Sequence, residues 1–147
     1  MKFGNYMTLE FPSKSSNESF ARTAVACFAA QLDPNLEELG DIRTAVSEAV
    51  TNCIVHAYRD TVGEIQIKVE ILDTAWVRIS VRDRGCGIED VRRAREPLYT
   101  TDREGERSGM GFTVMESFTD GVRVSSKPGR GTTVTMVKVL SELELDT

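Results

Sequence analysis

Ser47-Glu48-Ala49-Val50-Thr51-Asn52 is the stretch of this sequence that decides the fold. It lies within residues 36–57, where apolar side chains recur at helical spacing and predict one long amphipathic helix. The apolar stripe consists of Leu39, Ile42, Val46, Ala49, Val50, Cys53 and Ala57. At about 100° per residue, Glu48, Asn52 and His56 share one ridge along the margin of that stripe. Polar groups there can hold a ligand while the neighbouring core shields it.

The ridge offers three kinds of chemistry. Asn52 has a neutral amide oxygen, which suits Mg²⁺ because this ion retains several waters and takes few protein ligands. Glu48, one turn earlier, can accept a proton from a hydroxyl group or a water. His56 can contact a phosphate or a metal-bound water. A solvated face is the simpler interpretation of the Glu48 and Asn52 pair alone, and a structural role is the simpler one for His56.

A second motif, Asp83-Arg84-Gly85-Cys86-Gly87, follows a predicted strand at 76–82 in which apolar and polar residues alternate. Because its neighbours are apolar, the Asp83 carboxylate should be partly buried and should need hydrogen-bond donors. The amino group of adenine is such a donor, and Gly85 and Gly87 permit close approach of the backbone to a flat base. Thr132, at the start of the last predicted strand, is placed to share the adenine through a water. A tight turn after the strand is the alternative for this motif.

The third motif, Arg107-Ser108-Gly109-Met110-Gly111, opens a predicted helix. Glycines at a helix start expose backbone N–H groups and the positive end of the helix dipole, which suit phosphate. Arg107 adds a planar fork for a terminal phosphate. A plain helix start is the alternative. Residues 96–108 are polar and aperiodic and predict a mobile loop.

Composition narrows the class of protein. The 147 residues are expected to form a single domain, 1–147. The net charge is −5 without a Lys/Arg block, which disfavours direct binding of nucleic acid. No apolar run approaches the roughly 20 residues of a membrane span, and the first residues do not resemble a signal peptide. Three widely spaced cysteines fit a reducing cytoplasm better than a disulfide framework.

The order of predicted elements indicates the fold class. A strand at 7–11 precedes helices at 20–32 and 36–57, and a hairpin at 65–71 and 76–82 follows. A short helix at 88–95, the loop, a helix at 110–118 and strands at 122–124 and 132–140 complete the chain. This order predicts an α/β (α+β) two-layer sandwich, a mixed β-sheet with helices on one face.

The three ordered motifs resemble the N box and the two glycine boxes of the GHKL ATPases, which share the Bergerat ATP-binding fold and include gyrase, histidine kinases and MutL. The resemblance covers nearly the whole chain. It implies Asn52 as the Mg²⁺ ligand, Asp83 as the adenine ligand, and residues 96–108 with Gly109 and Gly111 as a lid over the phosphates of ATP.

Within that family, the chain is similar to bacterial serine kinases that double as anti-sigma factors, above all at 17–22, 47–52 and 106–112. His56, the only histidine, lies inside the N box, so no separate phospho-acceptor histidine is present. The resemblance implies a homodimer that binds ATP with Mg²⁺ and holds the sporulation sigma factor F inactive. It also implies phosphorylation of a serine on a small anti-anti-sigma protein, with Glu48 as the base.

Two other functions use the same pocket. A pure binding module, in which the nucleotide shapes the partner surface, has no need of a base at Glu48. An ATP hydrolase, with Glu48 activating water, usually carries a second domain that 147 residues cannot hold. Homologues from stress responses share the boxes but act on another sigma factor. Arg22 lies outside the apolar stripe of the first helix and is a candidate anchor for an acidic partner residue; a solvated arginine is the alternative.

Overall fold

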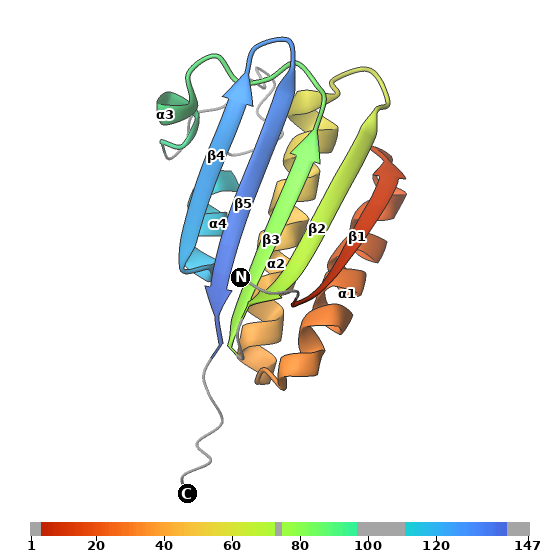
Figure 1. The fold of residues 1–147 in the computed structure, drawn as a ribbon. Coiled ribbons are helices and arrows are strands. Elements are labelled where there is room, and N and C mark those ends of the chain that lie inside the picture. The colour runs from red at the N-terminus through yellow and green to blue at the C-terminus, as the bar shows by residue number, and fades with distance from the viewer. Residues whose placement is uncertain (1–3, 73–74, 97–110, 141–147) are drawn as a thin grey trace, which may run out of the picture.

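The computed structural model describes residues 4–72, 75–96 and 111–140. Five strands form one sheet in the order β1-β2-β3-β5-β4, and α1, α2 and α4 cover one of its faces (Figure 1). The elements are β1 Asn5–Pro12, α1 Ser16–Ala29, the 3-10 turn η1 Ala30–Leu32, α2 Leu36–Asn52, the π-helical turn η2 Cys53–Ala57, β2 Glu64–Leu72, β3 Trp76–Asp83, α3 Val91–Ala94, α4 Gly111–Phe118, β4 Gly121–Lys127 and β5 Gly131–Val139. This α+β two-layer sandwich confirms the predicted fold class.

One detail of the predicted sheet is wrong: every strand pair is antiparallel, so the sheet is not mixed. The reason lies in the connections. β2–β3 and β4–β5 are hairpins, which are antiparallel by construction. The two helices between β1 and β2 carry the chain down the sheet and back again, so β2 starts at the end where β1 stops (Figure 1).

The core lies between the sheet and its helices. Inward side chains alternate along β2 and β3 and meet the predicted stripe of α2; all of Ile65, Ile67, Val69, Val77, Ile79, Ile42, Val46 and Val50 are fully buried. The start of α2 is defined by a capping box. The Asn35 side chain accepts a hydrogen bond from Glu38 N at 2.7 Å, and the Glu38 side chain accepts one from Asn35 N at 2.9 Å.

The end of this long helix differs from the expected regular helix to Ala57. After Asn52 the chain widens into the π-helical turn η2, and Tyr58 N donates to Cys53 O at 2.9 Å. The widened turn leaves Ala57 O to accept a hydrogen bond from Cys86 N at 3.1 Å. Turns of this kind are frequent at functional sites, and here the turn joins two of the three predicted motifs.

The remaining elements follow the predicted order with shifted bounds. The helix expected at 88–95 is the single turn α3, and the strand expected at 122–124 extends over β4. The loop expected after Arg95 and the start of the third motif lie outside the described residues, apart from Glu96 and Gly111. Within residues 4–72, 75–96 and 111–140, no helix combines the length and the apolar character needed to cross a membrane.

Candidate functional site

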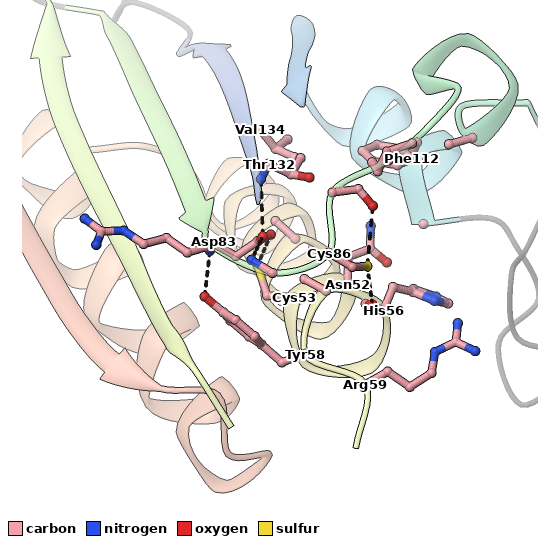
Figure 2. A pocket seen from close by; sticks show the side chains of 18 of the residues that line it. Asn52, Cys53, His56, Tyr58, Arg59, Asp83, Cys86, Phe112, Thr132 and Val134 are labelled. Atoms are coloured by element: carbon pink, nitrogen blue, oxygen red, sulfur yellow. Dashed lines mark hydrogen bonds between the residues drawn. The ribbon is translucent and has the colours of Figure 1, made fainter. Parts of the chain in front are cut away.

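A cavity of about 1390 Å³ opens where β3 ends and α2 passes into η2. Its walls come from α2 and η2, the loop after β3, α3, the first turn of α4 and the start of β5 (Figure 2). The structure brings eight predicted site residues to this cavity: Glu48, Asn52, His56, Asp83, Gly85, Gly87, Gly111 and Thr132. Arg107, Ser108, Gly109 and Met110 lie outside the described residues, so their roles stay predictions.

Asp83 is the buried acid of the cavity, with 5% of its surface exposed. Its Oδ1 accepts hydrogen bonds from Gly85 N at 2.9 Å and Thr132 N at 3.2 Å. Within the described part of the chain, its Oδ2 accepts only a longer contact from the Cys53 thiol, at 3.5 Å. Burial raises the pKa of Asp83, and these three hydrogen bonds oppose the rise. The Oδ2 atom therefore retains capacity to accept a hydrogen bond from a donor inside the cavity.

The glycines of the second motif serve the packing of the loop. A side chain at Gly87, whose φ is +78°, would begin 2.2 Å from Lys127 O. One at Gly85 would begin 2.3 Å from Ala57 O. The backbone of the protein itself thus requires glycine at both positions, and both glycines also line the cavity, so their close approach to a flat base stays a prediction. Gly129 N donates to Cys86 O at 2.7 Å and completes the attachment of this loop to the turn between β4 and β5.

Asn52, the last residue of α2, lies beside the first residue of α4. A Cβ atom added to Gly111 would lie 3.1 Å from Asn52 Oδ1 and 3.2 Å from Asn52 Nδ2. Glycine at this position therefore leaves room for the amide beside the helix N-terminus. Glu48 and Asn52 are both half-buried on the α2 wall. No group of three His, Cys, Asp or Glu residues in the described part of the chain is arranged to hold a metal ion.

Tyr58 was not among the predicted site residues, and its hydroxyl joins η2 to the sheet. It accepts a hydrogen bond from Arg84 N at 2.6 Å and donates one to Glu64 O at 2.6 Å. Burial raises the pKa of this hydroxyl. A Cβ at Gly63 would lie 2.2 Å from the Tyr58 ring, so glycine there admits the ring. The available signal was a tyrosine at the end of a core helix, because a buried tyrosine usually finds a partner for its hydroxyl.

Two further predicted residues have structural contacts of their own. The Thr132 hydroxyl lies 2.8 Å from Ser126 Oγ, which also accepts a hydrogen bond from Ile88 N at 2.8 Å. His56 lines the cavity, and its backbone carbonyl accepts a contact from the Cys86 thiol at 3.4 Å. A water bridge from Thr132 to a base and a phosphate contact of His56 both stay predictions.

A shallower groove of about 380 Å³ adjoins the α2 wall and is lined by Arg22, Gly40, Arg43, Thr44, Ser47 and Glu48. Glu48 thus borders both the cavity and the groove. Arg22 is half-exposed, and its Nη1 lies 3.0 Å from Glu18 Oε2. The Ser47 hydroxyl also donates to Glu18. Arg22 is therefore part of an α1–α2 polar network, which the sequence analysis did not foresee.

The fold, and the cavity at which the first two motifs meet, point to a class of nucleotide-binding domain. Residues 11–138 match the histidine kinase-like ATPase domain, and the chain belongs to that family. The resemblance to the GHKL ATPases is thereby confirmed.

Individual proteins are similar to this chain over nearly its whole length. The chain is 59% identical over 140 residues to "Anti-sigma F factor" of Caldanaerobacter subterraneus subsp. tengcongensis, covering 95% of this chain and 97% of that protein. It is 59% identical over 137 residues to "Anti-sigma F factor" of Pasteuria penetrans, covering 92% and 91%. Among solved structures, the RsbU and RsbW domains of Rv1364c from Mycobacterium tuberculosis match with a TM-score of 0.67 at 21% identity, over 94% of this chain and 32% of that one. This last match supports the fold.

Proposed function

We propose that the chain is an ATP-dependent protein-serine kinase that also acts as an anti-sigma factor. It binds ATP with Mg²⁺, holds the sporulation sigma factor F inactive, and phosphorylates a serine of a small anti-anti-sigma protein. The observation that carries this proposal is the single cavity that gathers Asp83, Asn52 and Glu48. The family supports ATP as the nucleotide, and the relatives named "Anti-sigma F factor" support sigma factor F as the partner.

The nucleotide is bound at its two ends by different elements. Asp83 Oδ2 accepts a hydrogen bond from the amino group of adenine, since Oδ1 is already occupied by two backbone donors. Asn52 offers an amide oxygen beside the N-terminus of α4, and it would hold Mg²⁺. This donor set fits the ion, which is usually bound by one or two protein oxygens, waters and substrate phosphates. The ion supplies neutralisation of the phosphate charge when bound.

Glu48 is the proposed base for an incoming protein substrate. The serine oxygen forms a bond to the γ-phosphorus of ATP while the bond to the bridging oxygen breaks, and Glu48 accepts the serine proton as ADP leaves. Support for this role comes from the position of Glu48, which borders both the cavity and the Arg22 groove. A substrate loop that enters from the groove reaches the carboxylate without crossing the adenine end of the cavity.

Partner recognition involves the same groove. Arg22 and Arg43 line it, so an acidic residue of a partner is attracted there and competes with Glu18 for Arg22. We further infer, on the resemblance alone, that the protein is a homodimer in the cytoplasm. Neither a nucleic acid nor a membrane is among the expected partners.

The decisive experiment offers the chain labelled ATP, Mg²⁺ and a panel of anti-anti-sigma proteins, each beside its serine-to-alanine variant. The expected result is phosphoserine on one wild-type panel member and none on its variant. Capture of sigma factors is measured in parallel. Capture of sigma factor F without any transfer would make the chain a binding module, and capture of another sigma factor would make it a stress-response homologue. ATP turnover that ignores every acceptor protein would indicate a hydrolase.

A further inference from the structure

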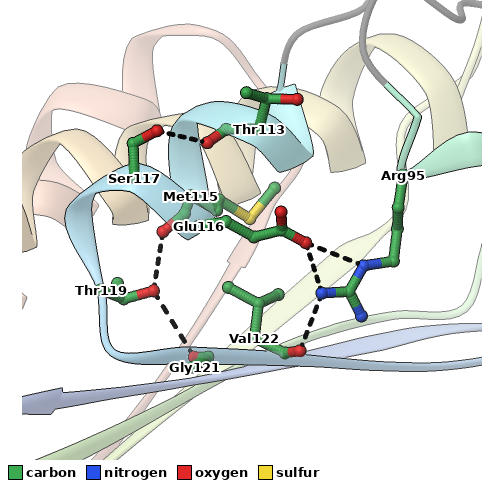
Figure 3. A network of polar contacts seen from close by, with 8 residues as sticks. All are labelled: Arg95, Thr113, Met115, Glu116, Ser117, Thr119, Gly121 and Val122. Atoms are coloured by element: carbon green, nitrogen blue, oxygen red, sulfur yellow. Dashed lines mark hydrogen bonds and ion pairs between the residues drawn. The ribbon is translucent and has the colours of Figure 1, made fainter.

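Arg95, directly after α3, joins two elements that are far apart in the sequence (Figure 3). Its Nε donates to Glu116 Oε2 at 3.1 Å, and its Nη2 donates to the same oxygen and to Val122 O at 3.0 Å. Glu116 belongs to α4, and Val122 belongs to β4. One guanidinium therefore bridges α3, α4 and β4.

The partners of Arg95 lie on a well-supported corner of the fold. Thr119 Oγ1 donates to Met115 O at 2.7 Å and so closes the last turn of α4 before β4 begins. The Met115 side chain is fully buried in the core. Glu116 and Val122 flank this corner, as Figure 3 shows. The ion pair therefore attaches α3 to a part of the fold that the core holds in place.

Both helices that the pair connects form walls of the cavity. Ala94 and Arg93 line it from α3, and Phe112 and Val114 line it from α4. A helix of one turn, such as α3, is not stable on its own hydrogen bonds and needs tertiary contacts to keep its position. The position of the α3 wall relative to the α4 wall thus depends on tertiary contacts such as those of Arg95 with Glu116 and Val122.

We propose that Arg95 is a positioning residue of the nucleotide site, which through Glu116 holds the α3 wall of the cavity against the α4 wall. This inference rests on the proposed binding of ATP in the cavity. Arg95 itself does not line the cavity, so it acts through the wall residues. The side chains of the pair are 28% and 43% exposed, so the pair contributes little to overall stability, and its effect lies in nucleotide affinity.

The chain offers a matched control for this pair. Arg78 Nε lies 2.9 Å from Glu70 Oε1, and these side chains are 42% and 21% exposed. The control pair joins β2 to β3 and has no residue in the cavity wall. In the double reversal of either pair, arginine and glutamate change places, so the summed length of the two side chains is conserved.

The experiment measures the dissociation constant for ATP with Mg²⁺ and the urea midpoint of unfolding. Both are measured for the unaltered chain, Arg95→Glu, Glu116→Arg and the double reversal. The same series of variants is made for Arg78 and Glu70. Each single reversal at Arg95 or Glu116 is expected to weaken nucleotide binding about three- to fivefold, the upper range for a partly exposed ion pair. The double reversal restores part of the affinity, because the ion pair forms again while the hydrogen bond to Val122 O stays lost, and the control series changes the affinity by less than about twofold.

The outcomes separate this inference from the proposed function. Equal losses in the double and single reversals, or an equal loss in the control series, would overturn the positioning role of Arg95. Loss of affinity that only parallels a lowered urea midpoint would overturn it as well. If the unaltered chain binds no nucleotide, the proposed function fails and this inference fails with it.

Discussion

Asp83→Asn is the most informative single change at this site, because it alters one oxygen of a carboxylate whose two oxygens have different partners. Oδ1 accepts hydrogen bonds from two backbone N–H groups, whereas Oδ2, among the residues that the structure describes, accepts only the contact from the Cys53 thiol. The two backbone donors select the asparagine orientation that keeps an oxygen at the Oδ1 position. The new NH₂ group then replaces Oδ2 and faces the amino group of adenine donor to donor.

The size of the effect follows from this geometry. A hydrogen bond to a charged group contributes about 1.5–3 kcal/mol, which corresponds to a loss of nucleotide affinity of roughly ten- to a hundredfold. The free energy of unfolding should change little, because Gly85 N and Thr132 N keep their acceptor. Asp83→Ala is the contrasting variant, since it removes the acceptor of both backbone donors and leaves the buried Thr132 N–H unpaired at a cost of about 1–3 kcal/mol.

Titration calorimetry with ATP and ADP, together with urea denaturation, separates these two effects. A dissociation constant for Asp83→Asn within twofold of the unaltered chain, with the fold intact, would refute the assignment of adenine to Asp83.

The same variant tests the direction of a pKa shift. Burial raises the pKa of Asp83 above its ordinary value of 3.8, so the folded state takes up a proton more readily than the unfolded chain does. The stability contributed by this group is therefore present below pH 3.8 and is lost as the pH rises through the folded pKa. Nucleotide affinity runs the opposite way, because protonation removes the acceptor. Both dependences should disappear in Asp83→Asn, measured as differences between the two proteins across that pH range.

Four further changes test other parts of the site. Glu48→Gln should retain ATP and sigma factor binding but abolish phosphoserine formation, and transfer at a near-normal rate would remove Glu48 from the mechanism. Asn52→Ala should weaken ATP binding chiefly with Mg²⁺ present; an equal loss in a chelator would show that Asn52 is not the metal ligand. Tyr58→Phe should lower the urea-measured free energy of unfolding by about 1–3 kcal/mol, because two hydrogen bonds are lost, one from Arg84 N and one to Glu64 O. Arg22→Glu should reduce pull-down of sigma factor F, and capture at unaltered strength would dismiss the groove as the contact.

Local patterns were sufficient for much of this fold. Apolar periodicity predicted the two long helices and the β2–β3 hairpin, because these patterns reflect which face of an element is buried. The same periodicity placed Glu48 and Asn52 on one margin of α2, where both line the cavity. Asp83 was predicted to be partly buried from its apolar neighbours, and the structure buries it almost completely.

The sequence by itself therefore determined the elements, their order and the polar margin of one helix, since each depends on residues a few positions apart. Only the tertiary structure decided how distant segments meet. The π-helical turn presents Ala57 O to the N–H of Cys86 in the loop after β3, and the Tyr58 hydroxyl joins η2 to the backbone at Arg84. Arg95 pairs with Glu116, which lies 21 positions later in the sequence. Such contacts depend on the path of the whole chain, which no local spacing encodes.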